Sequence, residues 1–291
     1  MKDWTITRNK VGRVQNTMVF LTVLLAILLA PQIQAQPAAR MGVSPQRYHI
    51  DFGGGGSETQ SLMVQNLTDQ PLTVKLSVNY WELDESNQVR ILPPEEDSLD
   101  GWIVINPLRV TIPPGSPQTI RWAVMPRLKP ENKEYRAMIF IEEELQPRDG
   151  SEGTNLRVKM RYGIPIYAGF GNPEPEAILH SVGTSGDGKT LRFDLTNEGN
   201  AHGRMAGHYG VWPADTFPGE TKALQLMRSR NPDQQDNGDF FFGQLPDSAV
   251  LPGYRRTLAM NINLPQSGEY ILQLDARFAQ LTIKDAIQLE K

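Results

Sequence analysis

The stretch SLMVQNLTDQPLTVKLSVNYW, residues 61–81, sets the pattern for the whole chain. It predicts a strand, an Asn-centred turn that contains Pro71, and a second strand. Farther along, TIPPGSPQTIRWAVMP (111–126) predicts a Pro-Gly turn that leads into another strand. Short apolar alternations separated by Gly, Pro, Asn and Asp clusters are typical of an all-β sandwich or barrel.

The second half of the chain repeats these landmarks in the same order. Residues 190–212 (TLRFDLTNEGNAHGRMAGHYGVW) again indicate strand, Asn-Gly turn and strand, and residues 249–265 again place a Pro-Gly turn before an alternating strand. Tyr135 and Tyr270 each open a late strand, a position that suits the tyrosine corner of immunoglobulin-like domains. Two tandem seven-stranded immunoglobulin-like β-sandwiches account for this repeat.

The limits of these domains follow from the composition at two places. The Gly/Pro-rich stretch AGFGNPEPEA (168–177) is a natural junction, so we expect an N-terminal domain at 36–170 and a C-terminal domain at 171–291. Residues 1–35 combine a basic start, a 13-residue apolar run (18–30) and small residues up to Ala35. This pattern predicts a secretory signal peptide that is cleaved after Ala35, with an uncleaved anchor as the alternative.

Charge and cysteine content narrow the classes of partner. The chain has no cysteine, so disulfides, thiolate metal sites and cysteine nucleophiles are excluded. The first 35 residues hold four of the 29 basic residues and one of the 33 acidic residues, and without them the net charge is −7. A nucleic acid is therefore not expected as the main partner, because phosphate binding favours a basic surface.

No pattern of residues predicts an enzyme. His202 and His208 share one face of a predicted strand, but spacing gives them no carboxylate partner, so neither a metal site nor a catalytic site is expected. GGGG (53–56) lacks the features of a phosphate loop and indicates a hairpin turn. Trp81, Trp102 and Trp122 are expected in the core rather than on a sugar-binding surface. We expect no cofactor.

Residues 155–167, NLRVKMRYGIPIY, show the most regular alternation. The apolar side chains of this segment fall on every second position: Leu156, Val158, Met160, Tyr162, Ile164 and Ile166. Arg157, Lys159 and Arg161 lie between them, so one face is apolar and the other is basic. Such a strand suits a sheet edge, and by alternation alone it would simply complete its own sheet.

Five stretches together resemble periplasmic pilus-assembly chaperones of the PapD-like family, whose members are exported two-domain immunoglobulin-like proteins. The stretches that carry the resemblance, in chain order, are GVSPQRYHIDF, SLMVQNLTDQPLTVKLSVNYW, INPLRVTIPPGSPQTIRW, ENKEYRAMIFIEEELQP and NLRVKMRYGIPIYAG. They cover most of residues 41–170, and the similarity is weaker over 171–291.

The resemblance implies that the alternating segment is a donor strand. In that family, a chaperone lends this strand to a pilus or fimbrial subunit whose own sandwich lacks one, and releases the subunit at an outer-membrane usher. The residues implied to fill the subunit's groove are Leu156, Val158, Met160, Tyr162 and Ile164, with Ile164 and Ile166 nearer the chain's own core. The polar stretch QPRDGSEGTN (146–155) would precede the strand as a loop. A self-capping dimer is left open as a further partner.

One departure concerns the anchor for the subunit's terminal carboxylate. Family members usually place an arginine in the opening strand and a lysine in the last strand of the first domain. Those places hold His49 and Pro165 here, so Arg47 and Arg161, which share strand parity with them, are the substitute candidates beside His49. The departure favours an alternative function, an exported structural or adhesive protein without chaperone activity. A hydrolase or glycan-binding enzyme is a third hypothesis.

Overall fold

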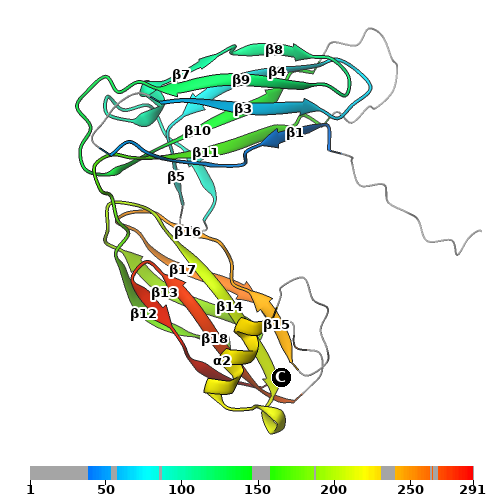
Figure 1. The fold of residues 1–291 in the computed structure, drawn as a ribbon, viewed down its shortest axis with the longest axis vertical. Helices are drawn as coiled ribbons and strands as arrows, with labels where there is room; N and C mark the ends of the chain where they lie inside the picture. Colours follow the sequence, from blue (N-terminus) through cyan, green and yellow to red (C-terminus); the bar gives the residue numbers. More distant parts are fainter. Residues whose placement is uncertain are drawn as a thin grey trace, which may run out of the picture. The chain divides into compact units, whose positions relative to one another are not determined.

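The computed structural model describes residues 39–53, 58–84, 87–145, 158–186, 188–230, 240–262, 264 and 268–290. The predicted signal peptide, the predicted loop at 146–155, Leu156 and most of the GGGG turn lie outside these residues. The fold is all-β, as the sequence predicts, with two sandwiches that follow each other along the chain (Figure 1).

The first sandwich packs a four-stranded sheet on a five-stranded sheet. The four-stranded sheet has the order β1 (Met41–Ser44), β3 (Glu58–Asn66), β9 (Pro117–Val124) and β7 (Ile103–Asn106). The five-stranded sheet has the order β2 (Tyr48–Asp51), β11 (Arg161–Gly169), β10 (Glu134–Glu143), β4 (Leu72–Asn79) and β8 (Arg109–Ile112). A short hairpin, β5 (Trp81–Leu83) and β6 (Val89–Ile91), and a 3-10 turn, η1 (Leu99–Trp102), complete it.

The second sandwich has a three-stranded sheet and a six-stranded sheet. The first has the order β12 (Ala177–Thr184), β13 (Thr190–Asn197) and β17 (Arg255–Asn261). The second has the order β15 (Phe241–Gln244), β14 (Gly203–Pro213), β18 (Glu269–Phe278) and β19 (Leu281–Ile283), with β16 (Ala249–Val250) on β14 and β20 (Ala286–Glu290) on β18. A 3-10 turn, η2 (Ala214–Thr216), and a helix, α2 (Glu220–Ser229), follow β14.

Each sandwich has its own apolar core, built from alternate side chains of its strands. The first core includes Trp102, Trp122, Ile139 and Ile166, and the second includes Phe193 and Phe278, all nearly or fully buried. The three tryptophans that the sequence places in the core, Trp81, Trp102 and Trp122, are at most 2% exposed. The exact domain limits at 35/36 and 170/171 stay predictions.

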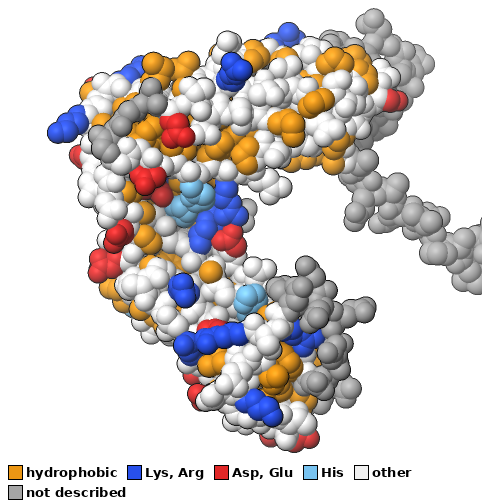
Figure 2. Space-filling model, in the orientation of Figure 1, with side chains coloured by type: hydrophobic (Ala, Val, Ile, Leu, Met, Phe, Trp, Pro, Cys, Tyr) orange, Lys and Arg blue, Asp and Glu red, His pale blue; other side chains and the backbone are white. Residues whose placement is uncertain are grey.

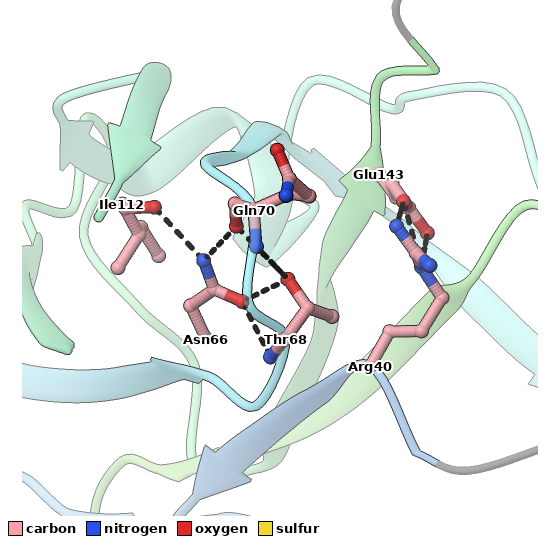
Figure 3. A network of polar contacts seen from close by, with 6 residues as sticks. All are labelled: Arg40, Asn66, Thr68, Gln70, Ile112 and Glu143. Carbon is pink, nitrogen blue, oxygen red and sulfur yellow. Dashed lines mark hydrogen bonds and ion pairs between the residues drawn. The ribbon is translucent and has the colours of Figure 1, made fainter. Parts of the chain in front are cut away.

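The Asn-centred turns of the two halves are built in the same way. Asn66 Nδ2 donates to the carbonyls of Gln70 (2.7 Å) and Ile112 (3.0 Å), and its Oδ1 accepts from the Thr68 N–H at 2.9 Å (Figure 3). One buried amide therefore ties the turn to the start of the next strand and to a strand 46 residues away.

Asn197 repeats this arrangement in the second sandwich. Its Nδ2 donates to the carbonyls of Ala201 (2.8 Å) and Val250 (2.9 Å), and its Oδ1 accepts from the Gly199 N–H (3.1 Å). The offsets of two and four residues match those around Asn66. The structural repeat thus explains why both halves of the sequence carry an asparagine at this point.

A tyrosine corner closes the start of β10. Tyr135 is buried, and its hydroxyl accepts a hydrogen bond from the Glu131 N–H, four residues upstream, at 3.0 Å. This geometry is the one expected of immunoglobulin-like domains, so the interpretation of Tyr135 from the sequence is confirmed.

Helix α2 was not predicted. It is ten residues long and buries only Ala223 and Met227. These pack with Trp212 and Phe240 in a small cluster separate from the main core. Two apolar contacts four residues apart are too few to produce a visible helical period in the sequence. None of the helices in the described part of the chain has the length and apolar character that crossing a membrane would require.

Candidate functional site

Strand β11 has an open edge along half its length. It pairs with β10 in antiparallel register from Arg161 to Gly169. On its other side β2 runs parallel to it, but only from Ile166 to Gly169. Among the described residues, the segment from Arg161 to Pro165 therefore has a neighbouring strand on one side only. An open edge of this kind can pair with another polypeptide.

The hydrogen-bond pattern shows which backbone groups this edge presents. The Glu143 N–H donates to the Met160 carbonyl at 2.9 Å, so Met160 and every second residue after it bond to β10. The residues between them, Arg161, Gly163 and Pro165, direct their polar backbone groups outward. Pro165 has no N–H and so loses nothing by this placement, which is the usual position of proline in a sheet.

The apolar side chains of β11 pass from full burial to exposure along one face. Ile166 is fully buried and Ile164 is 3% exposed, both in the core of the first sandwich. Tyr162 and Met160 are partly buried and pack against that core. Val158, just before the strand, is 53% exposed. The apolar face thus continues past the point where the sandwich's own core ends.

This placement refines the predicted donor residues. Ile164 is committed to its own sandwich, because its side chain lies in the core and its backbone groups bond to β10, so it offers a partner neither. Met160 and Tyr162 keep part of their surface free, and Val158 keeps about half. Leu156 lies outside the described residues. The role of these residues in binding stays a prediction.

The opposite face of β11 carries charge, and that charge is paired. Lys159 forms an ion pair with Glu142 of β10, and Arg161 approaches the same carboxylate at 3.5 Å. The Arg161 guanidinium also lies 3.8 Å from the centre of the Phe140 ring. The hydrogen bond from Lys159 lowers the pKa of Glu142 below its usual value, and the charge of Arg161 acts in the same direction while burial opposes it.

The structure separates the candidate anchor residues. Arg47 and His49 lie next to the paired half of β11, since Tyr48 is opposite Ile166 and His49 is opposite Tyr167. Arg161 lies five residues before Ile166, about 16 Å away at the rise of a strand. Arg161 therefore does not join Arg47 and His49 in one site.

His49 belongs to a cluster of three rings, in which its ring centre lies 5.2 Å from that of His202. It lies on Tyr167 with the ring centres 5.1 Å apart, and Tyr167 lies on His202 at 3.8 Å. Burial lowers the pKa of His49, and the nearby His202 and Arg204 lower it further, while Glu134 opposes them. His49 is thus held mainly neutral at pH 7, so it would accept or donate a hydrogen bond rather than supply a fixed charge.

Arg47 already holds a carboxylate. Its Nη2 lies 2.8 Å from Asp247 Oδ2, and Arg204 donates to the Asp247 backbone carbonyl at 2.8 Å. Burial alone would raise the pKa of Asp247, but the hydrogen bond from Arg47 and the charge of Arg204 hold it below its usual value. Figure 2 shows histidine, basic and acidic side chains gathered in one place on this face of the molecule.

Several residues of this cluster escape sequence reasoning. His202 is the partner of Glu134, with Nδ1 2.6 Å from Oε2 and both side chains less than 10% exposed. Arg204 and Asp247 also come from segments far along the chain from Arg47. No spacing in the sequence links residues that only the tertiary fold brings together. A basic residue and an acidic residue that lie on separate turns do not form a motif that can be recognised in the sequence.

The two histidines considered for metal binding make different contacts in the structure. His202 pairs with Glu134, whereas His208 stacks on Phe242 with ring centres 5.0 Å apart. Within the described ranges, no group of three or more His, Asp or Glu side chains is placed to hold a metal ion.

Comparison with known proteins gives structural likenesses only. No protein-family model matches the chain, and no curated protein matches it. Several of the similar solved structures are fimbrial chaperones. The class 5 fimbriae chaperone CfaA is 13% identical, with 85% of this chain and 98% of that chain covered and a TM-score of 0.43. The chaperone YadV is 12% identical, with 86% and 100% covered and a TM-score of 0.44.

A third similar structure is the Salmonella enterica SafA pilin in complex with the SafB chaperone. It is 12% identical, with 88% of this chain and 99% of that chain covered and a TM-score of 0.43.

Proposed function

We propose that this chain is a periplasmic, non-enzymatic chaperone that holds pilus or fimbrial subunits by lending them the open edge of β11. The observation that carries the proposal concerns one strand: among the described residues, β11 has no neighbouring strand on one side from Arg161 to Pro165, and its apolar face continues past its own core. A subunit that lacks one strand would gain both the backbone hydrogen bonds and the apolar side chains it needs.

The side chains of the edge contribute modestly to the free energy of binding, and the backbone hydrogen bonds set the register. Val158, Met160 and Tyr162 are partly exposed, so burying the rest of each contributes about 1 kcal/mol, roughly half the value for full burial. The outward groups of Arg161 and Gly163 add hydrogen bonds of about 1 kcal/mol each. The sum is moderate, which suits a partner that must later be released to an outer-membrane usher.

Arg47 is the better candidate for the subunit's terminal carboxylate. A partner strand that occupies the open edge of β11 lies in line with β2, and residue 47 immediately precedes β2. A chain that runs parallel to β11 in this position ends beside Arg47. Arg161 lies at the other end of the open edge, where it would be beside residues that precede the partner's C-terminus.

Substitutions that place charges on the apolar face of the edge test the proposal. The chain is co-expressed with the small secreted proteins encoded by neighbouring genes, and its complexes are purified from the periplasm. Val158→Asp with Met160→Asp is expected to abolish copurification, because a partner would have to bury two unpaired carboxylates. The matched control is Val104→Asp with Met63→Asp on the four-stranded sheet, since Val104 is also 53% exposed and Met63 is 43% exposed. A complex that survives the first pair refutes strand donation.

The second candidate is an exported structural or adhesive protein. It is favoured by the burial of Ile164 and by the absence of the anchor pair at His49 and Pro165. In that case both pairs of substitutions would leave copurifying partners unchanged, and the secreted proteins would bind elsewhere on the surface.

A further inference from the structure

A hollow lies on the outer face of the six-stranded sheet, away from β11 and its edge. Its floor is formed by small residues of two neighbouring strands, Ala206 and Gly207 of β14 and Ala276 of β18. The hollow has a volume of about 350 Å³. Ala206 and Gly207 have almost no side chain, and the Ala276 side chain lies in the core of the second sandwich, whereas the neighbouring side chains around the hollow are long.

The register of the strands explains which side chains surround the hollow. Ala206 is opposite Arg277, which is opposite Thr282 on β19, so these three form one row across the sheet. The next row contains His208 opposite Asp275. Lys284, just after β19, also lines the hollow.

Helix α2 limits the hollow on one side. The helix covers Trp212, farther along β14, and ends at Ser229. Arg228 in its last turn reaches over the sheet and binds both oxygens of Asp275, at 2.7 Å and 3.2 Å. Arg228 therefore lies at the boundary between the part of this sheet face that α2 covers and the part that contains the hollow.

The charges around the hollow do not cancel. Arg228 and Asp275 neutralise each other, whereas Arg277 and Lys284 have no ion-pair partner in the part of the chain that the structure describes. The hydrogen bond from Arg228 lowers the pKa of Asp275, burial opposes it, and Lys284 and His208 lower it further. The hollow thus has a surplus of two positive charges, in a chain that is acidic as a whole.

We propose that this hollow binds an anionic group with two negative charges, of which a phosphate monoester is the simplest. Arg277 and Lys284 would supply the two charges, and the guanidinium of Arg277 offers paired N–H donors that match phosphate oxygens. Thr282 adds a hydroxyl in the same row. The small floor residues leave room for several heavy atoms attached to the phosphate.

Titration with defined anions tests this proposal on residues 36–291, the predicted exported chain. Inorganic phosphate and glycerol phosphate are added at constant ionic strength, with chloride as the reference, and amide chemical shifts are followed by NMR. Saturable shifts are expected at Ala206, Arg277 and Thr282 with either phosphate. A Kd that is weaker by about a hundredfold or more is expected in Arg277→Gln with Lys284→Gln, because two charge-assisted hydrogen bonds are lost.

Two further variants make the outcome decisive. Ala206→Glu places a carboxylate beside Arg277 without removing any cation, and it is expected to abolish binding. Arg192→Gln, an exposed arginine on the other sheet of the same sandwich, is the control and is expected to change nothing. Absence of saturable shifts in the natural sequence, or equal binding in the Arg277/Lys284 variant, overturns the proposal.

The source of the phosphate is a separate question that the same variants answer. Vesicles that contain phosphatidic acid are compared with neutral vesicles in a sedimentation assay. Binding of phosphatidic acid vesicles that Ala206→Glu abolishes would assign a lipid head group, and binding of glycerol phosphate alone would assign a soluble phosphate. Neither result depends on the open edge of β11, so the proposed function can fail while this one holds.

Discussion

The graded burial along β11 predicts that its side chains divide the tasks of folding and binding. Ile166 is fully buried, whereas Val158 on the same face is 53% exposed. Ile166→Ala removes three carbon atoms from a packed core and is expected to cost about 2–5 kcal/mol of unfolding free energy. Val158→Ala is expected to change the unfolding free energy by less than about 0.5 kcal/mol, as surface substitutions do.

Urea unfolding of residues 36–291 measures both effects. Tryptophan fluorescence reports mainly on the first sandwich, where Trp81, Trp102 and Trp122 are buried, with a contribution from Trp212 in the second, and circular dichroism follows both sandwiches. Two separate transitions would be fitted separately, since a two-domain chain need not unfold in one step.

One outcome would contradict the predicted difference between these two variants. Equal losses of stability for Ile166→Ala and Val158→Ala would mean that residue 158 is as deeply packed as residue 166. The apolar face would then end inside the sandwich, and the reasoning that assigns its free end to a partner would be wrong.

Three other predictions follow from single contacts. Asn66→Ala and Asn197→Ala should each lower the unfolding free energy by about 1–3 kcal/mol in urea titrations, because each removes a buried amide that donates to two backbone carbonyls. Similar stability of either variant and the natural sequence would contradict the role of these turns. Glu142 should titrate below 4.5 by NMR, and Lys159→Gln should raise its pKa toward that value. Because the folded pKa of Glu142 is lowered, any stability from this ion pair is present above pH 4.5 and is lost as the pH falls through the folded pKa. An unchanged midpoint of the Glu142 titration in Lys159→Gln would refute the assignment. Gly207→Ala should destabilise the second sandwich by about 1–3 kcal/mol in thermal unfolding, since φ is +129° and an added Cβ would lie 2.1 Å from the Asp275 carbonyl oxygen; an unchanged melting temperature would contradict this.

The sequence predicted the class of fold because its signals are local. Asparagine turns, Pro-Gly turns and period-two alternation act over a few residues, and Asn66 and Asn197 mark the same point of each half. The tyrosine corner at Tyr135 is local too, since its bond spans four residues. Helix α2 was missed because Ala223 and Met227 are its only buried residues.

The site could be predicted only where it lies on one strand. Alternation placed Tyr162, Ile164 and Ile166 on one face, and the structure puts them there. Alternation does not report where the core ends along that face. The resemblance placed Ile164 and Ile166 nearer the chain's own core, and the structure buries both. Asp247 contacts Arg47 and Arg204, which are 200 and 43 residues away along the chain, and no single-sequence pattern encodes such contacts.

Hydrogen exchange at two backbone amides tests the central claim most directly. In the free chain, the amides of Arg161 and Gly163 face away from β10 and should exchange rapidly, while those of Tyr162 and Ile164 should be protected. In a complex with a copurified subunit, the account predicts that Arg161 and Gly163 become protected as well. Continued rapid exchange of the Gly163 amide in a saturated complex would show that the partner does not pair with this edge.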